Sequence, residues 1–359
     1  GKLIKDIVKQ NYELILVSPK DDYSEELVQM GFTHYEWKLS RKSINPLYEI
    51  NSLLNLINIY KLIKPDLVHH FTIKACLYGT LATKFSNVDK LINAITGLGH
   101  LFVSRNLSTQ ILRSFLKPIY RIIFRSKKSN IVFQNEDDMQ KFVDMRLAKK
   151  ESSYLIKSSG VDVNKFHAAE ETVGRFHNPI RILFPSRLII EKGILETIEA
   201  CESLWAESYY FQLLIAGKLN DSNSSAISEE TFSSIKTNSK IKYLGHVKDI
   251  KKLYESIDIV LLPSWREGLS KALIEAASMQ RLIITSDVAG CSNIIEHGKN
   301  GILVPVRNSQ AIKLALKLII HNPNLAKKFG VAARKKVIRE FNLELVNSQT
   351  LNLYKKLIY

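Results

Sequence analysis

The chain has 359 residues, of which 45% are hydrophobic and 24% charged, as is typical of a globular protein. This length predicts two domains of about 150–200 residues each. No run approaches the roughly 18 uninterrupted apolar residues of a membrane-spanning helix, and we expect no signal peptide. The three cysteines, Cys76, Cys201 and Cys291, are far apart and odd in number. They predict reduced thiols in a cytoplasmic protein, without disulfides or zinc.

The net charge of +16 calls for an anionic partner. Nucleic acid and an anionic membrane surface are both candidates on charge alone. From Lys90 to Phe133 the sequence contains basic residues and no acidic one. The excess is therefore concentrated in this stretch, which is where we look for such a partner.

The first half alternates between predicted helices and strands. It begins like the end of a helix with a strand over 13–18, so we expect the strand and glycine loop that open an α/β domain to be missing. A helix over 46–64 and a strand over 66–71 follow. Lys74 then lies in the first turn of a helix at the carboxyl end of that strand, where open sheets bind ligands. It either reaches a ligand or is solvated.

A strand over 90–95 leads into the sequence TGLG. Gly97 in this sequence makes a loop flexible enough to lie against a bound ligand. The two histidines of the preceding strand, His69 and His70, are interpreted as structural.

The stretch 108–128 is a predicted helix with basic residues at every fourth position, which places them along one face. These residues are Arg113, Lys117, Arg121 and Arg125. Pro118 interrupts the middle, so we expect a kink or two helices. The stretch fits an anionic membrane surface, or a core helix with one solvated basic face. Its aromatic residues lie on the apolar side, which does not favour stacking with nucleic acid bases.

A strand over 129–135 precedes the turn Gly160-Val161-Asp162, and residues 167–178 are interpreted as a linker. The second half opens with a strand over 181–188. Arg187 and Lys192 lie at its end, five residues apart. They are either surface residues or two fixed cations that neutralise a diphosphate.

The most informative stretch is IDIVLLPSWREGLSKALIEAASMQ, residues 257–280. Its apolar start predicts a strand buried in a parallel sheet, and a helix with one apolar stripe begins near residue 270. The backbone N–H groups at this helix start favour a diphosphate, together with the helix dipole. They belong to Gly268, Leu269 and Ser270.

Two carboxylates flank this helix start. Glu267 lies on the loop, where it can accept hydrogen bonds from sugar hydroxyls, and Glu275 lies inside the helix, where it can reach a ribose diol. The alternative is that both residues only complement the positive end of the helix dipole.

The sequence PSWREGLSKALIEA resembles the signature of retaining nucleotide-sugar glycosyltransferases of family four, with Ser270 where the family often has proline. The segment from Arg187 to Gly193 resembles the R-x4-K-G motif of the same family. The resemblance implies the GT-B architecture, an α/β fold of two Rossmann-like domains facing a central cleft. It places an acceptor-binding domain at 1–166, a nucleotide-sugar-binding domain at 178–342 and a helix that crosses back at 343–359.

The resemblance implies roles for the residues singled out above. It makes Glu267, Arg187 and Lys192 catalytic, and it lets the loop at Val247 hold the nucleotide base. The residues that bind the donor are Glu275, Gly268, Leu269, Ser270, Val247, Gly160 and Gly97. Thr96 and Asn293 stand where relatives often have histidine and glutamate. No Asp-x-Asp pair is present, so we expect neither a metal nor another cofactor.

The pieces PKDDYSEELVQMGF, LSRKSINPL and TGLG resemble bacterial transferases that extend undecaprenyl-diphosphate-linked sugars. This implies a hexosyltransferase that moves a hexose or N-acetylhexosamine from a UDP-sugar to such an acceptor, with retention. The product would be a glycan, O-antigen, lipopolysaccharide or capsule. The protein itself would be cytoplasmic and would lie peripherally on the inner face of the bacterial cytoplasmic membrane. Three alternatives stay open: a nucleotide-sugar epimerase of the same fold, a catalytically impaired membrane-bound partner, and a nucleic-acid binder.

Overall fold

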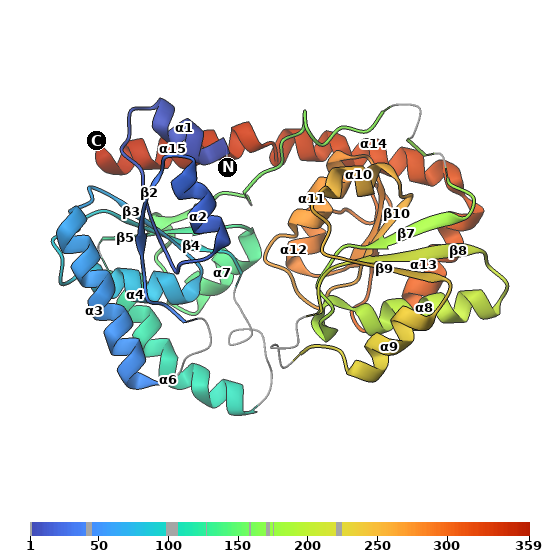
Figure 1. Cartoon of the computed structure of the whole chain (residues 1–359), viewed down its shortest axis with the longest axis horizontal. Coiled ribbons are helices and arrows are strands. Elements are labelled where there is room, and N and C mark those ends of the chain that lie inside the picture. Colours follow the sequence, from blue (N-terminus) through green and yellow to red (C-terminus); the bar gives the residue numbers. More distant parts are fainter. Residues whose placement is uncertain are drawn as a thin grey trace. The chain divides into compact units, whose positions relative to one another are not determined.

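The computed structural model describes residues 2–40, 45–97, 107–126, 128–157, 159–169, 173–174, 176–219 and 225–359. The chain forms two compact units, each built of parallel strands and helices (Figure 1). Unit 1 comprises Gly1–Ile156 and Asn347–Tyr359, and unit 2 comprises Lys157–Val346. No helix among the described residues is long and apolar enough to cross a membrane.

Unit 1 contains a four-stranded parallel sheet in the order β3-β4-β5-β6 and a separate two-stranded parallel sheet, β1-β2. The strands are β1 (Ile15–Ser18), β2 (Thr33–Glu36), β3 (Val68–Phe71), β4 (Leu91–Ile95), β5 (Ser129–Phe133) and β6 (Ser153–Leu155). The helices are α1 (Lys2–Lys9), α2 (Asp22–Gln29), α3 (Pro46–Ile63), α4 (Ile73–Thr83), α6 (Leu107–Phe124) and α7 (Glu136–Asp144). Of the two alternatives expected at Pro118, a kink or two helices, the second is wrong, because α6 continues through this residue as one helix.

His70 of β3 is a buried core residue of unit 1, in agreement with the structural role expected from the sequence. One ring nitrogen lies 2.8 Å from the Tyr60 hydroxyl and the other lies 2.9 Å from the amide oxygen of Asn93. A Cβ on Gly79 of α4 would lie 2.3 Å from the ring, so only glycine fits there. Burial lowers the pKa of His70 to about 4.

The last helix, α15 (Leu343–Ile358), is fastened to unit 1 over its C-terminal part. Its Tyr354 hydroxyl lies 2.7 Å from Nδ1 of His69. Asn347 donates to Asp6 over 2.6 Å at the start of this segment. The return of the final helix to the first unit, expected from the resemblance, therefore begins at Asn347.

The boundary between the units lies earlier than the predicted end of the first domain at residue 166. Residues 157–166 group with unit 2 because their backbone is hydrogen-bonded there. The Val161 amide donates to Phe341 over 2.9 Å, and Arg334 donates to the carbonyls of Val163 and Phe166. Sequence composition does not reveal such backbone contacts, which group this segment with unit 2 although it precedes the predicted linker at 167–178.

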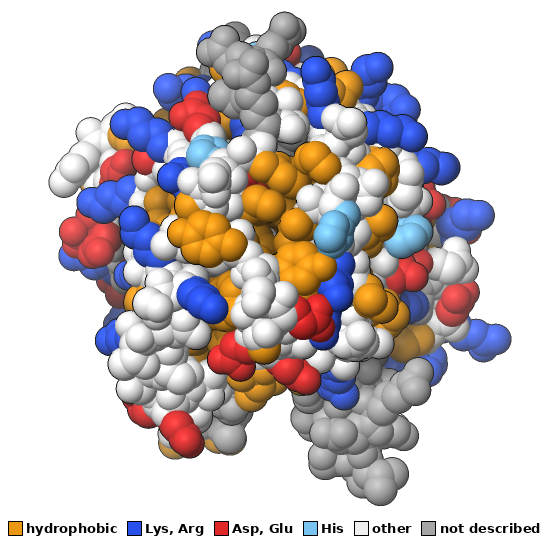
Figure 2. Space-filling view, turned by 90° about the vertical axis from the view of Figure 1, so that its right-hand side faces the viewer, with side chains coloured by type: hydrophobic (Ala, Val, Ile, Leu, Met, Phe, Trp, Pro, Cys, Tyr) orange, Lys and Arg blue, Asp and Glu red, His pale blue; other side chains and the backbone are white. Residues whose placement is uncertain are grey.

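Unit 2 contains a six-stranded parallel sheet in the order β12-β11-β10-β7-β8-β9. The strands are β7 (Ile180–Phe184), β8 (Phe211–Ala216), β9 (Ile241–Gly245), β10 (Ile259–Leu262), β11 (Leu282–Ser286) and β12 (Ile302–Val304). The helices are α8 (Ile194–Ala206), α9 (Glu229–Thr237), α10 (Ile250–Glu255), α11 (Lys271–Ser278), α12 (Ala289–Ser292), α13 (Ser309–His321) and α14 (Pro323–Glu340). Figure 2 shows a face with hydrophobic side chains near its centre and Lys and Arg side chains around them.

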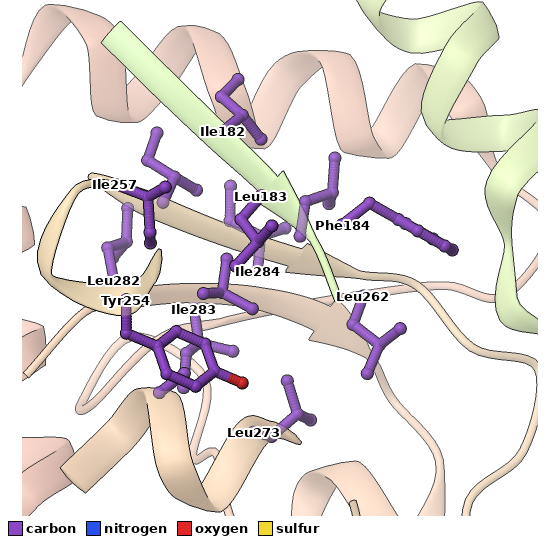
Figure 3. Packing of buried hydrophobic residues seen from close by; sticks show 14 of the residues in the cluster. Ile182, Leu183, Phe184, Tyr254, Ile257, Leu262, Leu273, Leu282, Ile283 and Ile284 are labelled. Carbon is purple, nitrogen blue, oxygen red and sulfur yellow. The ribbon is translucent and has the colours of Figure 1, made fainter. Parts of the chain in front are cut away.

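The central strands β7 and β10 are buried, as their apolar runs predict. Figure 3 shows this core, in which the side chains of β7 pack with those of β10, β11 and α11. Tyr254 lies fully buried beside it and donates its hydroxyl to the carbonyl of Ala272 over 3.0 Å. In chain order β7 is the first strand of the unit and β10 the fourth, yet they are neighbours in the sheet, so the strand order reverses between them. Open α/β sheets bind ligands outside the carboxyl ends of the strands at such a point.

The His70 network makes a prediction for stability. His70→Phe keeps a ring in place but leaves the Tyr60 hydroxyl and the Asn93 oxygen unpartnered, so we expect the free energy of unfolding to fall by about 2–4 kcal/mol. Between pH 6.5, the ordinary pKa of histidine, and about 4, the unfolded chain binds a proton that buried His70 does not. Wild-type stability therefore falls as the pH is lowered through this window, and it falls less steeply in His70→Phe.

Urea unfolding followed by circular dichroism across this pH window measures both effects. Tyr60→Phe is the matched control, because it removes one partner and keeps the imidazole. We expect it to lower stability while leaving the pH slope of the wild type in place. Equal slopes for wild type and His70→Phe would contradict a buried neutral imidazole.

Candidate active site

Two of the predicted catalytic residues meet at the point where the strand order reverses. Lys192 Nζ lies 2.5 Å from Glu267 Oε1, although the residues are 75 positions apart in sequence. The Ser264 hydroxyl donates to the same carboxylate oxygen over 2.8 Å. The two charged side chains are only 18% and 11% exposed. A cation and a carboxylate are therefore held together at the carboxyl ends of β7 and β10.

Gly193 allows the two loops to approach so closely. Lys192 is the last residue of a 3-10 turn, η3 (Ile190–Lys192), and Gly193 follows it with a φ of 78°, in the left-handed region. A Cβ at Gly193 would lie 2.3 Å from the carbonyl oxygen of Pro263, at the start of the β10 loop. Both the backbone angle and the space require glycine.

Arg187 also lies on the loop after β7, but unlike Lys192 it is not part of the buried ion pair with Glu267. The residue is exposed, and within the part of the chain that the structure describes its side chain has no hydrogen bond or ion pair. The preceding residue packs closely against the end of β8, because a Cβ at Gly217 would lie 1.8 Å from the Ser186 carbonyl oxygen. The structure thus places Arg187 near the end of β7 as a cation open to an anion, apart from the Lys192–Glu267 pair.

The predicted amide group opens helix α11. Ser270 is its N-cap residue, with extended backbone angles and no side-chain cap hydrogen bond. Leu269 is buried in the core of unit 2 and therefore offers a ligand only its backbone. Gly268, on the other side, is half-buried and carries no side chain. At the N-terminus of α11, these residues therefore present backbone groups rather than side chains to a ligand.

Glu275 is buried within α11 and close to two lysines. Its Oε1 lies 3.6 Å from Lys271 Nζ. Desolvation raises the pKa of Glu275, while the charges of Lys271 and Lys165 oppose this rise. Lys165 was missed by the sequence reasoning, since its only signal is that it closely follows the Gly160-Val161-Asp162 turn. A buried carboxylate held by neighbouring cations is suited to accept hydrogen bonds from a ligand.

A third loop closes against Glu267. Gly290, in the short helix α12 after β11, would place a Cβ 2.4 Å from the carbonyl oxygen of Glu267. The neighbouring Cys291 is fully buried, and desolvation together with the charge of Glu267 raises its thiol pKa to about 12. The thiol is therefore protonated and inert. Asn293, at the end of α12, donates its amide to the Ala289 carbonyl over 2.5 Å.

The remaining predicted residues are Val247 and Gly160 in unit 2 and Gly97 in unit 1. Val247 follows β9 and packs partly buried against the core of unit 2. Gly160 has a φ of 71°, and a Cβ there would lie 2.6 Å from Cα of Leu343, so its contact is with the chain itself. Gly97 follows β4 in unit 1 with a φ of 141°, and the rest of its loop lies outside the described residues.

Lys74 is neither solvated nor extended toward a ligand. Its Nζ lies 2.9 Å from Oε1 of Glu49 and donates to the Ser40 carbonyl over 2.7 Å. The Tyr78 hydroxyl donates to the other oxygen of Glu49. The pairing joins α3 to α4, and no local sequence pattern predicts it because Glu49 and Lys74 are 25 residues apart.

Comparisons with known families cover most of the chain. A sequence model described as "Glycosyl transferases group 1" matches residues 167–336, which include the whole Lys192–Glu267 centre. A second, described as "Glycosyl transferase 4-like", matches residues 1–135. The two matches therefore fall one in each half of the chain.

Named relatives extend over the full length. An N,N'-diacetylbacillosaminyl-diphospho-undecaprenol alpha-1,3-N-acetylgalactosaminyltransferase from Campylobacter jejuni is 24% identical, over 99% of this chain and 94% of the relative. A UDP-Gal:alpha-D-GlcNAc-diphosphoundecaprenol alpha-1,3-galactosyltransferase from Escherichia coli is 23% identical, over 90% of this chain and 83% of the relative.

Solved structures share the fold. A glycosyltransferase from Rickettsia africae, 24% identical, superposes with a TM-score of 0.78 over 99% of this chain and 93% of its own. Anabaena Alr3699/HepE in complex with UDP and glucose, 17% identical, gives 0.80 over 99% and 95%. Both family models and the fold agree with the resemblance found in the sequence. The chain therefore carries a group 1 glycosyltransferase domain and a family 4-like glycosyltransferase domain, and it is a transferase enzyme of the GT-B fold.

Proposed function

We propose that the protein transfers a hexose or N-acetylhexosamine from a UDP-sugar to an undecaprenyl-diphosphate-linked sugar, with retention, in surface polysaccharide synthesis. The observation that carries the proposal is the Lys192–Glu267 pair at the strand-order reversal of unit 2. The names of the Campylobacter and Escherichia relatives support the acceptor class, and the UDP complexes of the Anabaena protein support the donor class.

Cations and amides receive the diphosphate of the donor in this proposal. Arg187 is open to an anion, and Lys192 exchanges its bond to Glu267 for a phosphate oxygen. The amides from Gly268 to Ser270, at the positive end of α11, complete the site. Because these groups supply the positive charge, the reaction needs no metal ion.

The two glutamates hold the sugars of the donor. Once Lys192 turns to the phosphate, Glu267 accepts hydrogen bonds from hydroxyls of the transferred sugar. Ser264 keeps the carboxylate oriented through its 2.8 Å hydrogen bond. Glu275 accepts from the ribose diol, which replaces the water that its burial has removed.

The reaction requires no separate base from the protein. The acceptor hydroxyl oxygen bonds to the anomeric carbon on the face from which the diphosphate oxygen departs. Its proton passes to a phosphate oxygen of the leaving UDP. Lys192 and Arg187 stabilise the charge that develops on that group. The products are UDP and a lipid-linked saccharide longer by one sugar.

Helix α6 supplies the surface that we propose for the anionic inner face of the cytoplasmic membrane. Tyr120, Ile123 and Phe124 are buried in the core of unit 1. The outer side combines exposed isoleucines with exposed basic residues, namely Ile119, Ile122, Arg121 and Arg125. Apolar side chains beside cations suit the boundary between lipid headgroups and acyl chains.

We expect Lys192→Ala and Glu267→Gln each to lower kcat for sugar transfer by about 100-fold or more, since each removes a charge that orients the donor or its leaving group. Arg187→Ala lowers transfer as well. The measurement is radiolabelled sugar transfer from UDP-sugars to a synthetic polyprenyl-diphosphate sugar, in the presence of EDTA. Wild-type activity is expected to persist in EDTA.

Lys317→Ala is the control, because it breaks another lysine–glutamate pair of unit 2, with Glu207, on the surface. It is expected to transfer like wild type. Full transfer by Lys192→Ala would contradict the proposed roles. Conversion of a UDP-sugar without acceptor would instead identify an epimerase, and vesicle binding without turnover a non-catalytic partner.

The membrane surface is tested by Arg121→Ala/Arg125→Ala. At about 1 kcal/mol per basic residue, we expect binding to phosphatidylglycerol vesicles to weaken on the order of 30-fold, as measured by cosedimentation. Lys328→Ala/Lys335→Ala removes the same charge from exposed positions of α14 and is expected to bind like wild type. Equal weakening by both pairs would show a dependence on net charge alone.

A further inference from the structure

Trp265 differs from the other two tryptophans in its hydrogen-bond partner. The indole N–H groups of Trp37 and Trp205 donate to backbone carbonyls, those of Ser52 and Phe211. Trp265 donates to the carboxylate of Glu196 on α8, over 2.8 Å. A hydrogen bond to an ionised acceptor is stronger and more directional than one to a carbonyl. The sequence reasoning assigned Trp265 no role, although it lies two residues before Glu267.

Trp265 and its neighbour Arg266 join the same two chain segments as the Lys192–Glu267 pair. The backbone amide of Trp265 donates to the carbonyl of Glu191 over 2.9 Å, and the next residue, Arg266, reaches the Glu191 carboxylate over 3.4 Å. Glu191 directly precedes Lys192, and Arg266 directly precedes Glu267. The same two loop segments are therefore joined at consecutive positions, so a shift of Trp265 along its loop shifts the carboxylate relative to the amine.

The segment after β12 contacts the face of the Trp265 ring. The guanidinium of Arg307 lies 3.9 Å from the centre of the Trp265 ring. Arg307 follows β12 with a φ of 56°, a left-handed conformation that is strained for a residue with a side chain. Trp265 is thus held by α8 through its indole N–H group and by the segment after β12 through the face of its ring. The other oxygen of Glu196 is buried and has no partner among the described residues, so this carboxylate is held mainly by the indole.

We propose that Trp265 is a positioning residue for sugar transfer. Its contacts with Glu196 and Arg307 hold the loop after β10, and this loop in turn positions Glu267 opposite Lys192. Trp265 itself touches neither donor nor acceptor in this account. It acts by keeping the loop after β10 in register with the turn before α8. The inference rests on the proposed function, because its main readout is sugar transfer.

The experiment is a double-mutant cycle on kcat. Trp265→Phe keeps a ring under Arg307 and removes the indole N–H, while Glu196→Ala removes the acceptor of the same bond. We expect each to lower kcat by about 10- to 100-fold, the loss typical of a misplaced catalytic group, with KM for the UDP-sugar little changed. Because both act through one bond, the double variant is expected to lose no more than the worse single variant.

Trp205→Phe is the matched control, since it makes the same substitution in the same unit and also loses one indole hydrogen bond. It is expected to lower the melting temperature and to leave kcat of the folded protein unchanged. Additive losses in the cycle, or losses that follow the folded fraction alone, would overturn the positioning role. So would a folded Trp265→Phe with wild-type kcat.

Tryptophan emission separates this inference from the proposed function. When UDP draws Lys192 away from Glu267, the surroundings of Trp265 change, so UDP is expected to alter the emission of wild type and Trp205→Phe but not of Trp265→Phe. If wild type, Trp205→Phe and Trp265→Phe all bind UDP in the calorimeter and show the same change in emission, the positioning role of Trp265 is overturned while the proposed function stands. Absence of UDP binding by wild type overturns the proposed function, and the inference with it.

Discussion

The proposed site of unit 2 depends on two opposite charges that are held at the carboxyl ends of the central strands with little access to water. Lys192 and Glu267 are 18% and 11% exposed, so either one alone would be a poorly solvated charge. Removing one partner of a fully buried pair costs about 3–5 kcal/mol, because the other is left uncompensated. In the structure the two charges satisfy each other. A diphosphate can replace the carboxylate as partner of the amine, and sugar hydroxyls can replace the amine as partner of the carboxylate.

Backbone topology and glycines bring these charges together. The strand order places β7 beside β10, so that the loops after both strands leave the sheet at neighbouring points. Gly193 lets one loop lie on Pro263, and Gly290 lets a third loop lie on Glu267. A methyl group at either position would meet backbone atoms, which cannot move as a flexible side chain can. The centre is therefore set by close backbone packing, with the charged side chains added to it.

Much of this could be predicted from the sequence where local pattern decides structure. The apolar run before Pro263 became β10, and α11 begins at Lys271, beside the predicted start at residue 270. The Glu-x7-Glu spacing and the R-x4-K-G motif pointed to Glu267, Glu275 and Lys192. What joins these residues is long-range in sequence, and only the resemblance to a family brought the two motifs together.

The parts that sequence did not reveal depend on tertiary partners. By its sequence position Lys74 either reaches a ligand or is solvated, but in the structure it pairs with Glu49 of another helix. Residues 157–166 belong to unit 2 through backbone bonds that leave no compositional trace. Trp265 has an unremarkable place in a loop sequence, and its importance follows from Glu196 and Arg307, which come from two distant elements. In each case the deciding contact joins segments with no shared local pattern.

A crystal structure with UDP bound is the decisive measurement for the Lys192–Glu267 pair. We predict that a phosphate oxygen lies within hydrogen-bond distance of Lys192 Nζ, that this amine has moved away from Glu267, and that the helix start at Gly268–Ser270 faces the diphosphate. UDP bound elsewhere, with the Lys192–Glu267 pair intact, would contradict this prediction.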